Sequence, residues 1–562
     1  MPETKQYPEA FGPNAWLIEE MYRQFREQPE TVGESWRDFF DDYRPLSTPA
    51  PQVGAALPVP KPAEPSEDGR AVPPGATPLR GGFARIVENM ERSLSIPTAT
   101  SARIIPVKLL EENRRIINQY LADSTGGKMS FTHIIAWAIV KALKKMPVMA
   151  ISFFESNGTA YKITPEHVNL GLAVDVAKKD GSRTLLVPNI KAADAMDFSS
   201  FFAAYNEILR KVYANQITPE DFAGTTVSLT NPGTIGTVHS VPRLMSGQGL
   251  IVATGAIDYP PEYQAADPRT IAQLGIGKVM TVTSTYDHRV IQGAESGLFL
   301  QALHKLLIGE DGFYEEIFAS MKIPYQPVRL TRDINPAPEG GDALIEKQAR
   351  VLQLINIYRV RGHLIANLNP LSTKAPSHKE LDPERYGLTV WDYDREYITG
   401  GLGKQRATLR EILDTLREAY CQTIGVEYMH IQEPVQKEWI QQRVEGVPRK
   451  KWMESAAKRH ILTKLNEGEA FERFLHAKYV GHKRFSLEGA ESLIPMLDAL
   501  LLQASKHDIG EVVMGMAHRG RINVLANILG KSYQEIFLKF EDNPDPNSRE
   551  GTGDVKYHLG AT

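Results

Sequence analysis

The spacing of hydrophobic and polar positions changes several times along this chain, and each change predicts an element. Near the start, Leu17, Met21 and Phe25 recur at helical spacing between Asn14, a residue type that often caps helices, and Pro29, which ends the pattern. These positions predict a short amphipathic helix. Roughly forty residues cannot bury its apolar surface alone, so we expect the segment to dock on another part of the assembly.

Between residues 79 and 323 the pattern alternates between helix and strand. The run SFTHIIAWAIVKALKKM predicts a buried helix whose basic last turn suits the negative end of the helix dipole. Five alternating or β-branched runs predict a sheet of at least five strands: HVNLGLAVDVA, RTLLVPNI, TTVSLT, LIVATGAI and KVMTVTSTY. We therefore expect one α/β domain here.

After residue 342 the pattern becomes mainly helical and then changes again. Val351, Leu354, Ile355 and Tyr358 share one helical face. From Arg484 onward, the runs AESLIPMLDALLLQAS, EVVMGMA and RINVLANILG predict a helix, a strand and a helix. Such alternation is typical of the beginning of a parallel α/β unit.

Two segments rich in Pro divide these regions. Residues 45–78 contain ten of the 37 prolines and no aromatic residue, a composition that favours an extended linker over a packed core. Residues 324–342 are also rich in Pro and Gly. The predicted organisation is an N-terminal helical segment (1–44), a linker (45–78), an α/β domain (79–323), a linker (324–342), a helical region (343–483) and the start of a second α/β domain (484–562).

Composition excludes several classes of protein. Hydrophobic residues make up 42% and charged residues 23%, the net charge is −4 and the pI is near 6.4, so no basic surface invites nucleic acid. The longest apolar run, around 134–140, is far shorter than the ~20 residues of a membrane span, and the N-terminus lacks the plan of a signal peptide. A single cysteine, Cys421, rules out an internal disulfide framework. We expect a cytoplasmic protein with no nucleic-acid or membrane partner.

The stretch TYDHRVIQGAESG holds the first candidate for chemistry. It places His288 at the edge between a strand and a loop, where a neutral imidazole can take a proton from a thiol or hydroxyl. Acyl transfer also needs a donor for the oxyanion, and Thr230 closes the strand VSLT before a Gly/Pro turn. From spacing alone, a structural histidine paired with Asp287 or a backbone group is the commoner outcome for His288, and an ordinary strand threonine is the commoner outcome for Thr230.

Three blocks, TSTYDHRVIQGAESG, VSLTNPGTIGT and VPRLMSGQGLIVATGAI, resemble the 2-oxoacid dehydrogenase acyltransferases, which share the chloramphenicol acetyltransferase fold. The resemblance implies that His288 deprotonates the coenzyme A thiol, which attacks a lipoyl thioester, and that Thr230 polarises the intermediate. It also implies a homo-oligomer with its site between subunits. Gln292 stands where the family has aspartate. This departure leaves open a non-catalytic scaffold or a module that senses acetyl-coenzyme A.

Other blocks resemble the thiamine-dependent 2-oxoglutarate dehydrogenase component: FGPNAWLIEEMYRQF, YRVRGHLIANLNPL, KYVGHKRFSLEGAESLIPML, VVMGMAHRGRINVLANILGK and GDVKYHLG. This resemblance implies that Arg519 contacts the phosphates of thiamine diphosphate and that His518 and His558 meet the substrate. The GDG motif that would hold Mg²⁺ does not occur in the sequence. We therefore expect the decarboxylase site to be incomplete in this chain.

Together the blocks resemble a fused actinobacterial form, in which an acyltransferase domain without a lipoyl carrier precedes the decarboxylase. This implies oxidative decarboxylation of 2-oxoglutarate in the tricarboxylic acid cycle, with succinyl transfer to lipoamide and coenzyme A. A lipoylated acyltransferase subunit and dihydrolipoamide dehydrogenase are the implied partners. A free-standing acyltransferase with a helical extension is the remaining alternative.

Overall fold

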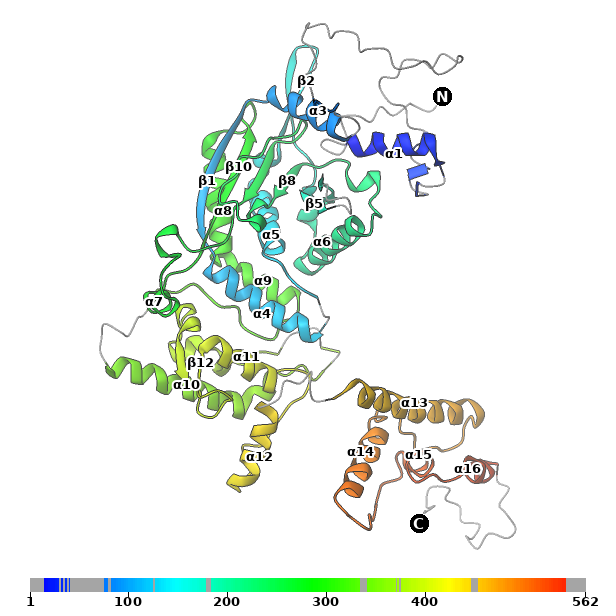
Figure 1. Cartoon of the computed structure of the whole chain (residues 1–562). Helices are drawn as coiled ribbons and strands as arrows, with labels where there is room; N and C mark the ends of the chain where they lie inside the picture. Colours follow the sequence, from blue (N-terminus) through cyan, green and yellow to red (C-terminus); the bar gives the residue numbers. More distant parts are fainter. Residues whose placement is uncertain are drawn as a thin grey trace. The chain divides into compact units, whose positions relative to one another are not determined.

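The computed structural model divides the chain into two compact units, Met1–Gly446 and Val447–Thr562 (Figure 1). The structure describes residues 15–29, 32–33, 36–37, 40, 75–78, 82–124, 127–177, 183–333, 341–369, 371–372, 376–445 and 453–541. Most of the predicted linker 45–78 therefore lies outside the described residues, and so does His558. The helical region predicted at 343–483 is divided between the two units.

The first unit contains a six-stranded mixed sheet. Its strands, in spatial order, are β1 (Thr98–Pro106), β10 (Val279–Asp287), β9 (Leu250–Thr254), β8 (Val227–Thr230), β4 (Leu170–Leu172) and β7 (Asn189–Ile190). β8 runs parallel to β9 and β4, while β10 runs antiparallel to both β1 and β9. All five predicted runs contribute a strand, so the predicted α/β sheet is confirmed. Two further pairs form separately, β2 (Ser152–Ser156) with β3 (Thr159–Ile163) and β5 (Val174–Ala177) with β6 (Arg183–Leu186).

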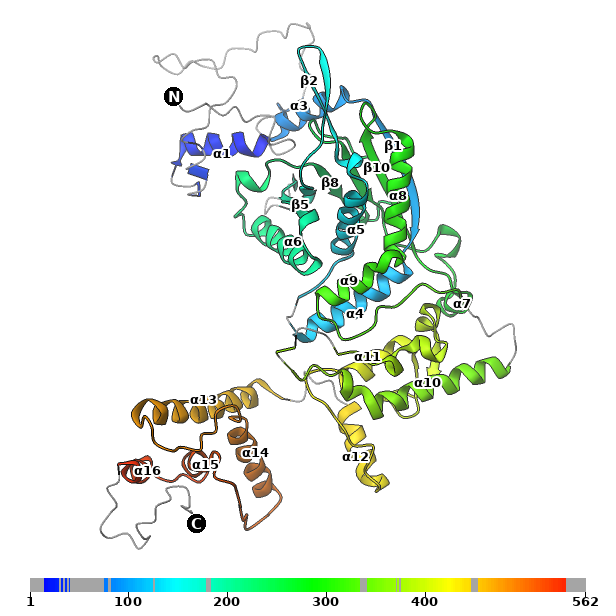
Figure 2. The same ribbon diagram turned by 180° about the vertical axis from the view of Figure 1, so that it is seen from behind.

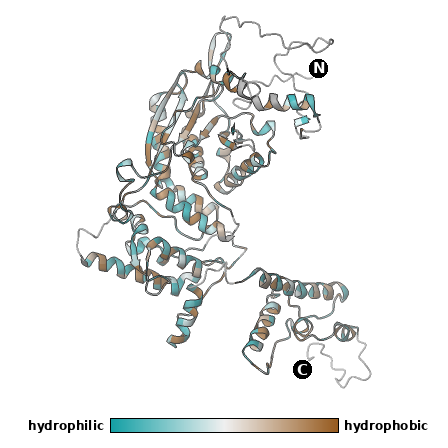
Figure 3. Cartoon of the chain, in the orientation of Figure 1, coloured by the Kyte–Doolittle hydropathy of each residue, from teal (hydrophilic) through white to brown (hydrophobic). Residues whose placement is uncertain are grey.

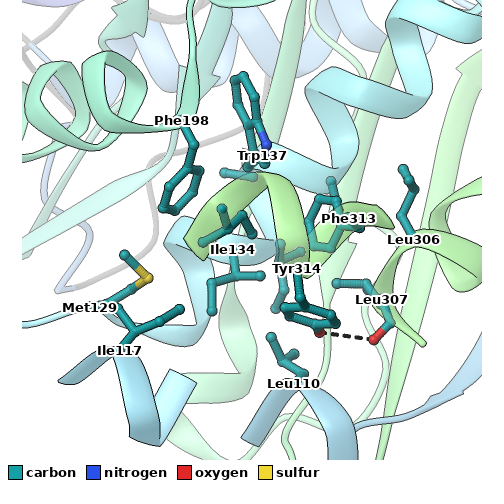
Figure 4. Packing of buried hydrophobic residues seen from close by; sticks show 14 of the residues in the cluster. Leu110, Ile117, Met129, Ile134, Trp137, Phe198, Leu306, Leu307, Phe313 and Tyr314 are labelled. Carbon is teal, nitrogen blue, oxygen red and sulfur yellow. Dashed lines mark hydrogen bonds between the residues drawn. The ribbon is translucent and has the colours of Figure 1, made fainter. Parts of the chain in front are cut away.

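Helices bury the apolar residues of this unit. The predicted buried helix is α5 (Phe131–Lys145), which contacts α4 (Lys108–Ser124), α6 (Phe198–Tyr213) and α8 (Gly293–Leu307). Figure 4 shows Trp137 of α5 near Phe198 of α6, and Phe313 and Tyr314 of α9 (Phe313–Ser320) in the same core. The Tyr314 hydroxyl donates to the Leu307 carbonyl over 2.9 Å. These contacts give the sheet a rigid support, because buried side chains pack at nearly crystalline density.

The N-terminal segment packs on the same unit. Helix α1 (Ala15–Glu27) contacts α3 (Gly82–Leu94), and the Trp36 indole donates to the Ile217 carbonyl over 3.0 Å. Ile18, Val32 and Phe40 are all buried in the main core. The expected docking of this segment therefore takes place on the sheet-containing part of the chain itself (Figures 1 and 2).

The helical part of the first unit comprises α10 (Gly341–Arg361), α11 (Leu409–Tyr420) and α12 (Pro434–Glu445). The described part of the predicted linker 324–342 packs closely: Val328 and the buried Asn113 of α4 exchange two hydrogen bonds, of 2.8 and 3.0 Å. Residues 324–333 thus belong to the packed unit. Pro324 and Pro327 lie just before Val328, whose backbone is bonded by the Asn113 side chain instead of by a neighbouring strand.

In the described part of the second unit, helices are joined by segments without regular structure. Its longer helices are α13 (Ser455–Lys478), α14 (Leu493–Lys506), α15 (Arg521–Asn527) and α16 (Tyr533–Phe540), each with hydrophilic and hydrophobic stretches (Figure 3). The strand predicted from EVVMGMA does not form: residues 511–517 lack regular structure. A strand needs a hydrogen-bonded neighbour, and the described residues of this unit supply none. Within the described parts of the chain, no helix is long and apolar enough to cross a membrane.

Candidate functional site

His288 lies directly after the carboxyl end of β10 and its side chain is exposed. Its backbone amide donates to the Pro97 carbonyl over 2.9 Å, and the preceding Asp287 amide donates to the Gly249 carbonyl over 3.1 Å. The imidazole meets the Tyr286 ring edge-on, with centroids 5.5 Å apart. The backbone of the turn is therefore fixed, while the imidazole itself is open to a partner.

Asp287 pairs with Arg289. The Arg289 Nη2 lies 2.6 Å from the Asp287 Oδ2, and its Nε lies 2.9 Å from the Oδ1. Asp287 is buried, so its charge requires a close counter-ion. A pair between His288 and Asp287 would have made His288 a structural residue. Asp287 pairs with Arg289 instead. Arg289 was not predicted as a site residue, although a cation two residues after an aspartate at a strand end was a usable signal in the sequence.

Thr230 ends β8, and the strand register places it far from His288 in the same chain. Thr230 aligns with Ala253 of β9, and Ala253 aligns with Thr283 of β10. Because β10 is antiparallel to β9, the chain runs from Thr283 away from the end of the sheet at which Thr230 lies. His288 lies five residues beyond Thr283, at the opposite ends of the strands. At ~3.3 Å per residue and ~4.8 Å per strand, the two residues are separated by roughly 15–20 Å. Thr230 and His288 were predicted as the two residues of one transfer site, and a single chain does not bring them together.

An apolar loop follows Thr230. Asn231 donates to the Thr132 hydroxyl over 2.9 Å, which fixes the start of the turn. Beyond it, Ile235, Val238 and Val241 are 77%, 65% and 57% exposed, values unusual for large aliphatic residues so close together. Neighbouring exposed apolar side chains of this kind are typical of protein interaction surfaces.

Gln292 occupies the N-cap position of α8, four residues after His288, and its side chain is exposed. Its backbone amide donates to the Glu295 Oε2 over 2.6 Å. A residue at this position can serve the helix N-terminus with a polar oxygen, and an amide oxygen is able to do so without a charge. The departure from aspartate is therefore compatible with the local fold.

In the second unit, two segments that the sequence analysis singled out lie together. The Gly520 amide donates to the Phe485 carbonyl over 2.8 Å, and the His518 ring lies 5.0 Å from the Phe485 ring. Arg519 is exposed and its Nη2 donates to the Glu488 carbonyl over 2.7 Å. Among the described residues, no group of three or more His, Cys, Asp or Glu side chains could hold a metal ion.

Two parts of the chain match known protein families. Residues 74–311 match the family described as 2-oxoacid dehydrogenases acyltransferase (catalytic domain), and residues 9–45 match the 2-oxoglutarate dehydrogenase N-terminus. Among solved structures, a probable dihydrolipoamide acetyltransferase from Listeria monocytogenes is 20% identical, with 41% of this chain and 93% of that chain covered and a TM-score of 0.36. A dihydrolipoamide acetyltransferase from Azotobacter vinelandii is 22% identical, with 44% of this chain and 96% of that chain covered and a TM-score of 0.36. By the family match, residues 74–311 are similar to the acyltransferase catalytic domain of the 2-oxoacid dehydrogenases.

Curated relatives indicate a narrower class of protein. The chain is 50% identical to the multifunctional 2-oxoglutarate metabolism enzyme of Mycolicibacterium vanbaalenii, with 99% of this chain and 48% of the relative covered. A protein of the same name from Mycobacterium sp. (strain JLS) is 48% identical, with 99% and 49% covered. The chain is thus a homologue of the multifunctional 2-oxoglutarate metabolism enzymes and spans about half their length, which confirms the resemblance identified from the sequence.

Proposed function

We propose that residues 79–323 transfer a succinyl group between lipoamide and coenzyme A, as part of an enzyme that oxidatively decarboxylates 2-oxoglutarate in the tricarboxylic acid cycle. The observation that supports this function most directly is the exposed imidazole of His288, held by its backbone at the sheet edge while Asp287 is occupied by Arg289. An imidazole that is fixed but free on its ring nitrogens suits a general base.

The chemistry needs only one proton carrier and one oxyanion donor. His288 takes the proton of the coenzyme A thiol, and the resulting thiolate forms a new C–S bond to the thioester carbonyl of succinyl-lipoamide. The tetrahedral oxyanion accepts a hydrogen bond from the Thr230 hydroxyl. When the intermediate collapses, the C–S bond to the lipoyl arm breaks, and the leaving thiolate recovers the proton from the imidazolium.

The separation of the two residues requires a second copy of the chain. Within one copy, Thr230 and His288 lie at opposite ends of the strands. A hydrogen bond from Thr230 to an intermediate at His288 must therefore come from a neighbouring copy of the chain. The exposed Ile235, Val238 and Val241 provide an apolar surface next to Thr230 for such a contact. A homo-oligomer whose interface joins unlike surfaces places one His288 and one Thr230 at each interface.

The remaining parts of the proposal concern the intact protein. Apart from the linker predicted at 324–342, the domain assignments are those of the sequence: a dehydrogenase N-terminal segment (1–44), a linker (45–78), a helical dehydrogenase region (343–483) and the start of a thiamine diphosphate-binding domain (484–562). Arg519 would contact the cofactor, and His518 and His558 the substrate, in a cytoplasmic complex. The lipoyl arm and its reoxidation would come from a lipoylated acyltransferase subunit and dihydrolipoamide dehydrogenase.

A second function is favoured by Gln292, which replaces the family's aspartate. Under this alternative the domain is a scaffold or senses acetyl-coenzyme A, and it performs no transfer. The two functions differ in turnover, so a direct assay separates them.

The test is succinyl transfer from succinyl-dihydrolipoamide to coenzyme A by the full chain. We expect His288→Ala to lower kcat by about 10²–10⁴-fold and Thr230→Ala by about 10²–10³-fold. His167→Ala, which removes another exposed histidine of the same unit, is the control and should leave kcat unchanged. Absence of turnover in the wild-type chain would favour the scaffold, and equal turnover in wild type and His288→Ala would exclude His288 as the base.

A further inference from the structure

Beside His288, three side chains from two elements form a continuous stack. The Arg289 guanidinium lies over the Phe153 ring of β2, with its Cζ 3.8 Å from the ring centroid, and bonds the Asp287 carboxylate on its edge. We propose that Phe153 is a positioning residue for the base. It holds the guanidinium in place, and the guanidinium in turn fixes the turn that carries His288. This inference rests on the proposed role of His288.

The stack has an electrostatic reason. The Asp287 carboxylate is buried and needs a compensating charge, and that charge comes from a residue only two positions later. Arg289 must therefore fold back across the turn, and its long side chain has many competing rotamers. A planar guanidinium resting on an aromatic face is restricted to one of them.

The hairpin that carries Phe153 is anchored independently of Arg289. β2 pairs with β3 along its whole length, with Phe153 opposite Lys162. Just before β2, the Ile151 carbonyl packs so closely on Gly249 that a Cβ at position 249 would lie 1.9 Å from its oxygen. Gly249 also accepts the hydrogen bond of the Asp287 amide. The hairpin and the His288 turn are thus joined both at Gly249 and through the stack.

The hairpin contains its own control residue. Phe154 follows Phe153, and successive residues of a strand point to opposite faces. Phe154 is 45% exposed and its ring lies 6.3 Å from that of Tyr161, its cross-strand partner. A change at Phe154 therefore alters the same hairpin and the same residue type, and leaves the contact with Arg289 intact.

The experiment compares Phe153→Leu, Phe153→Tyr and Phe154→Leu in the full chain with two readouts. The first is succinyl transfer, and the second is the rate of carbethoxylation of His288 by diethyl pyrocarbonate, followed by peptide mass spectrometry. From the size of a cation–π contact, Phe153→Leu should lower kcat about five- to tenfold with KM nearly constant, and change the carbethoxylation rate at least about twofold. Phe153→Tyr and Phe154→Leu should behave as wild type in both.

Equal effects of Phe153→Leu and Phe154→Leu in both readouts would overturn the proposal. In an Arg289→Lys background, Phe153→Leu should add nothing further, whereas additive losses would show that Phe153 does not act through Arg289. Phe153→Met keeps the bulk without the ring and replaces Phe153→Leu if that variant does not fold. If the wild-type chain shows no transfer, the proposed function fails, and the carbethoxylation rates still decide whether Phe153 positions His288.

Discussion

At the scale of single residues, His133 shows how burial sets the charge of a histidine. Its side chain is enclosed by Phe202 and Tyr205, and its Nδ1 accepts from the Ser130 amide at the start of α5. Burial lowers the pKa of His133 from 6.5 to about 4, and a hydrogen bond with Asn206 opposes this only in part. His133 is therefore a neutral structural residue, in contrast to the exposed His288.

This lowered pKa predicts acid sensitivity. On acidification the unfolded chain binds the proton near pH 6.5, whereas the folded chain does so only near pH 4, so the free energy of unfolding falls between these values. The loss amounts to at most about 3 kcal/mol. Urea unfolding at pH 7 and pH 4.5 should show a lower free energy of unfolding at pH 4.5, and His133→Gln should reduce this difference. If the difference between the two pH values were the same in the variant, the lowered pKa of His133 would not be its cause.

The sequence predicted where single residues lie in their elements, and it did not predict which distant residues they contact. His288 does follow a strand, because the alternation in KVMTVTSTY indicates where that strand ends. The distance to Thr230 could not be predicted, since it depends on which strands pair and in which direction. The contact between Phe153 and Arg289 was missed for the same reason: 136 residues separate them in the sequence.

At the scale of elements, a buried ion cluster joins α4 to the helical part of the first unit. Glu112 of α4 is 1% exposed and pairs with Lys108, over 3.0 Å, and with Arg410 of α11. Asp394 contacts the same two cations. Burial alone would raise the pKa of Asp394, but Lys108 and Arg410 outweigh it and lower the pKa. The cluster thus holds two cations and two carboxylates in a compensated arrangement.

Removing one charge should break this balance. Glu112→Gln leaves the buried Lys108 and the half-buried Arg410 with a single carboxylate, and we expect a loss of about 2–4 kcal/mol in the free energy of unfolding. Glu88→Gln removes an exposed carboxylate paired with Arg92 and should cost less than about 0.5 kcal/mol. Chemical denaturation of both variants measures the difference. Similar losses in the two would show that the cluster does not hold α4 to α11.

Elements with strong apolar periodicity were predicted, and elements that depend on their neighbours were not. The buried face of α5 and the five strand runs are visible in the sequence because each carries its own hydrophobic pattern. β1 was missed because most of TATSARIIP is polar or small, and its strand structure comes from pairing with β10. The run at 511–517 has the converse property: its composition favours a strand, and the described residues offer it no partner.

At the scale of the whole molecule, the sheet register has the largest consequence. A single copy separates the candidate base from the candidate oxyanion donor, and the apolar loop after Thr230 is exposed. Neither residue can complete a transfer site alone. The central claim is therefore that each site takes His288 from one copy and Thr230 from another.

Mixing two inactive variants tests this claim most directly. Full chains carrying His288→Ala and Thr230→Ala are co-expressed with different affinity tags, and oligomers containing both are purified and assayed for succinyl transfer. In cyclic oligomers that contain both variants, about a half of the interfaces of a dimer, or about a third of those of a trimer, combine an intact His288 with an intact Thr230. We predict recovery of about that fraction of wild-type activity. Mixed oligomers as inactive as either variant alone, in a preparation whose wild-type counterpart is active, would contradict the account.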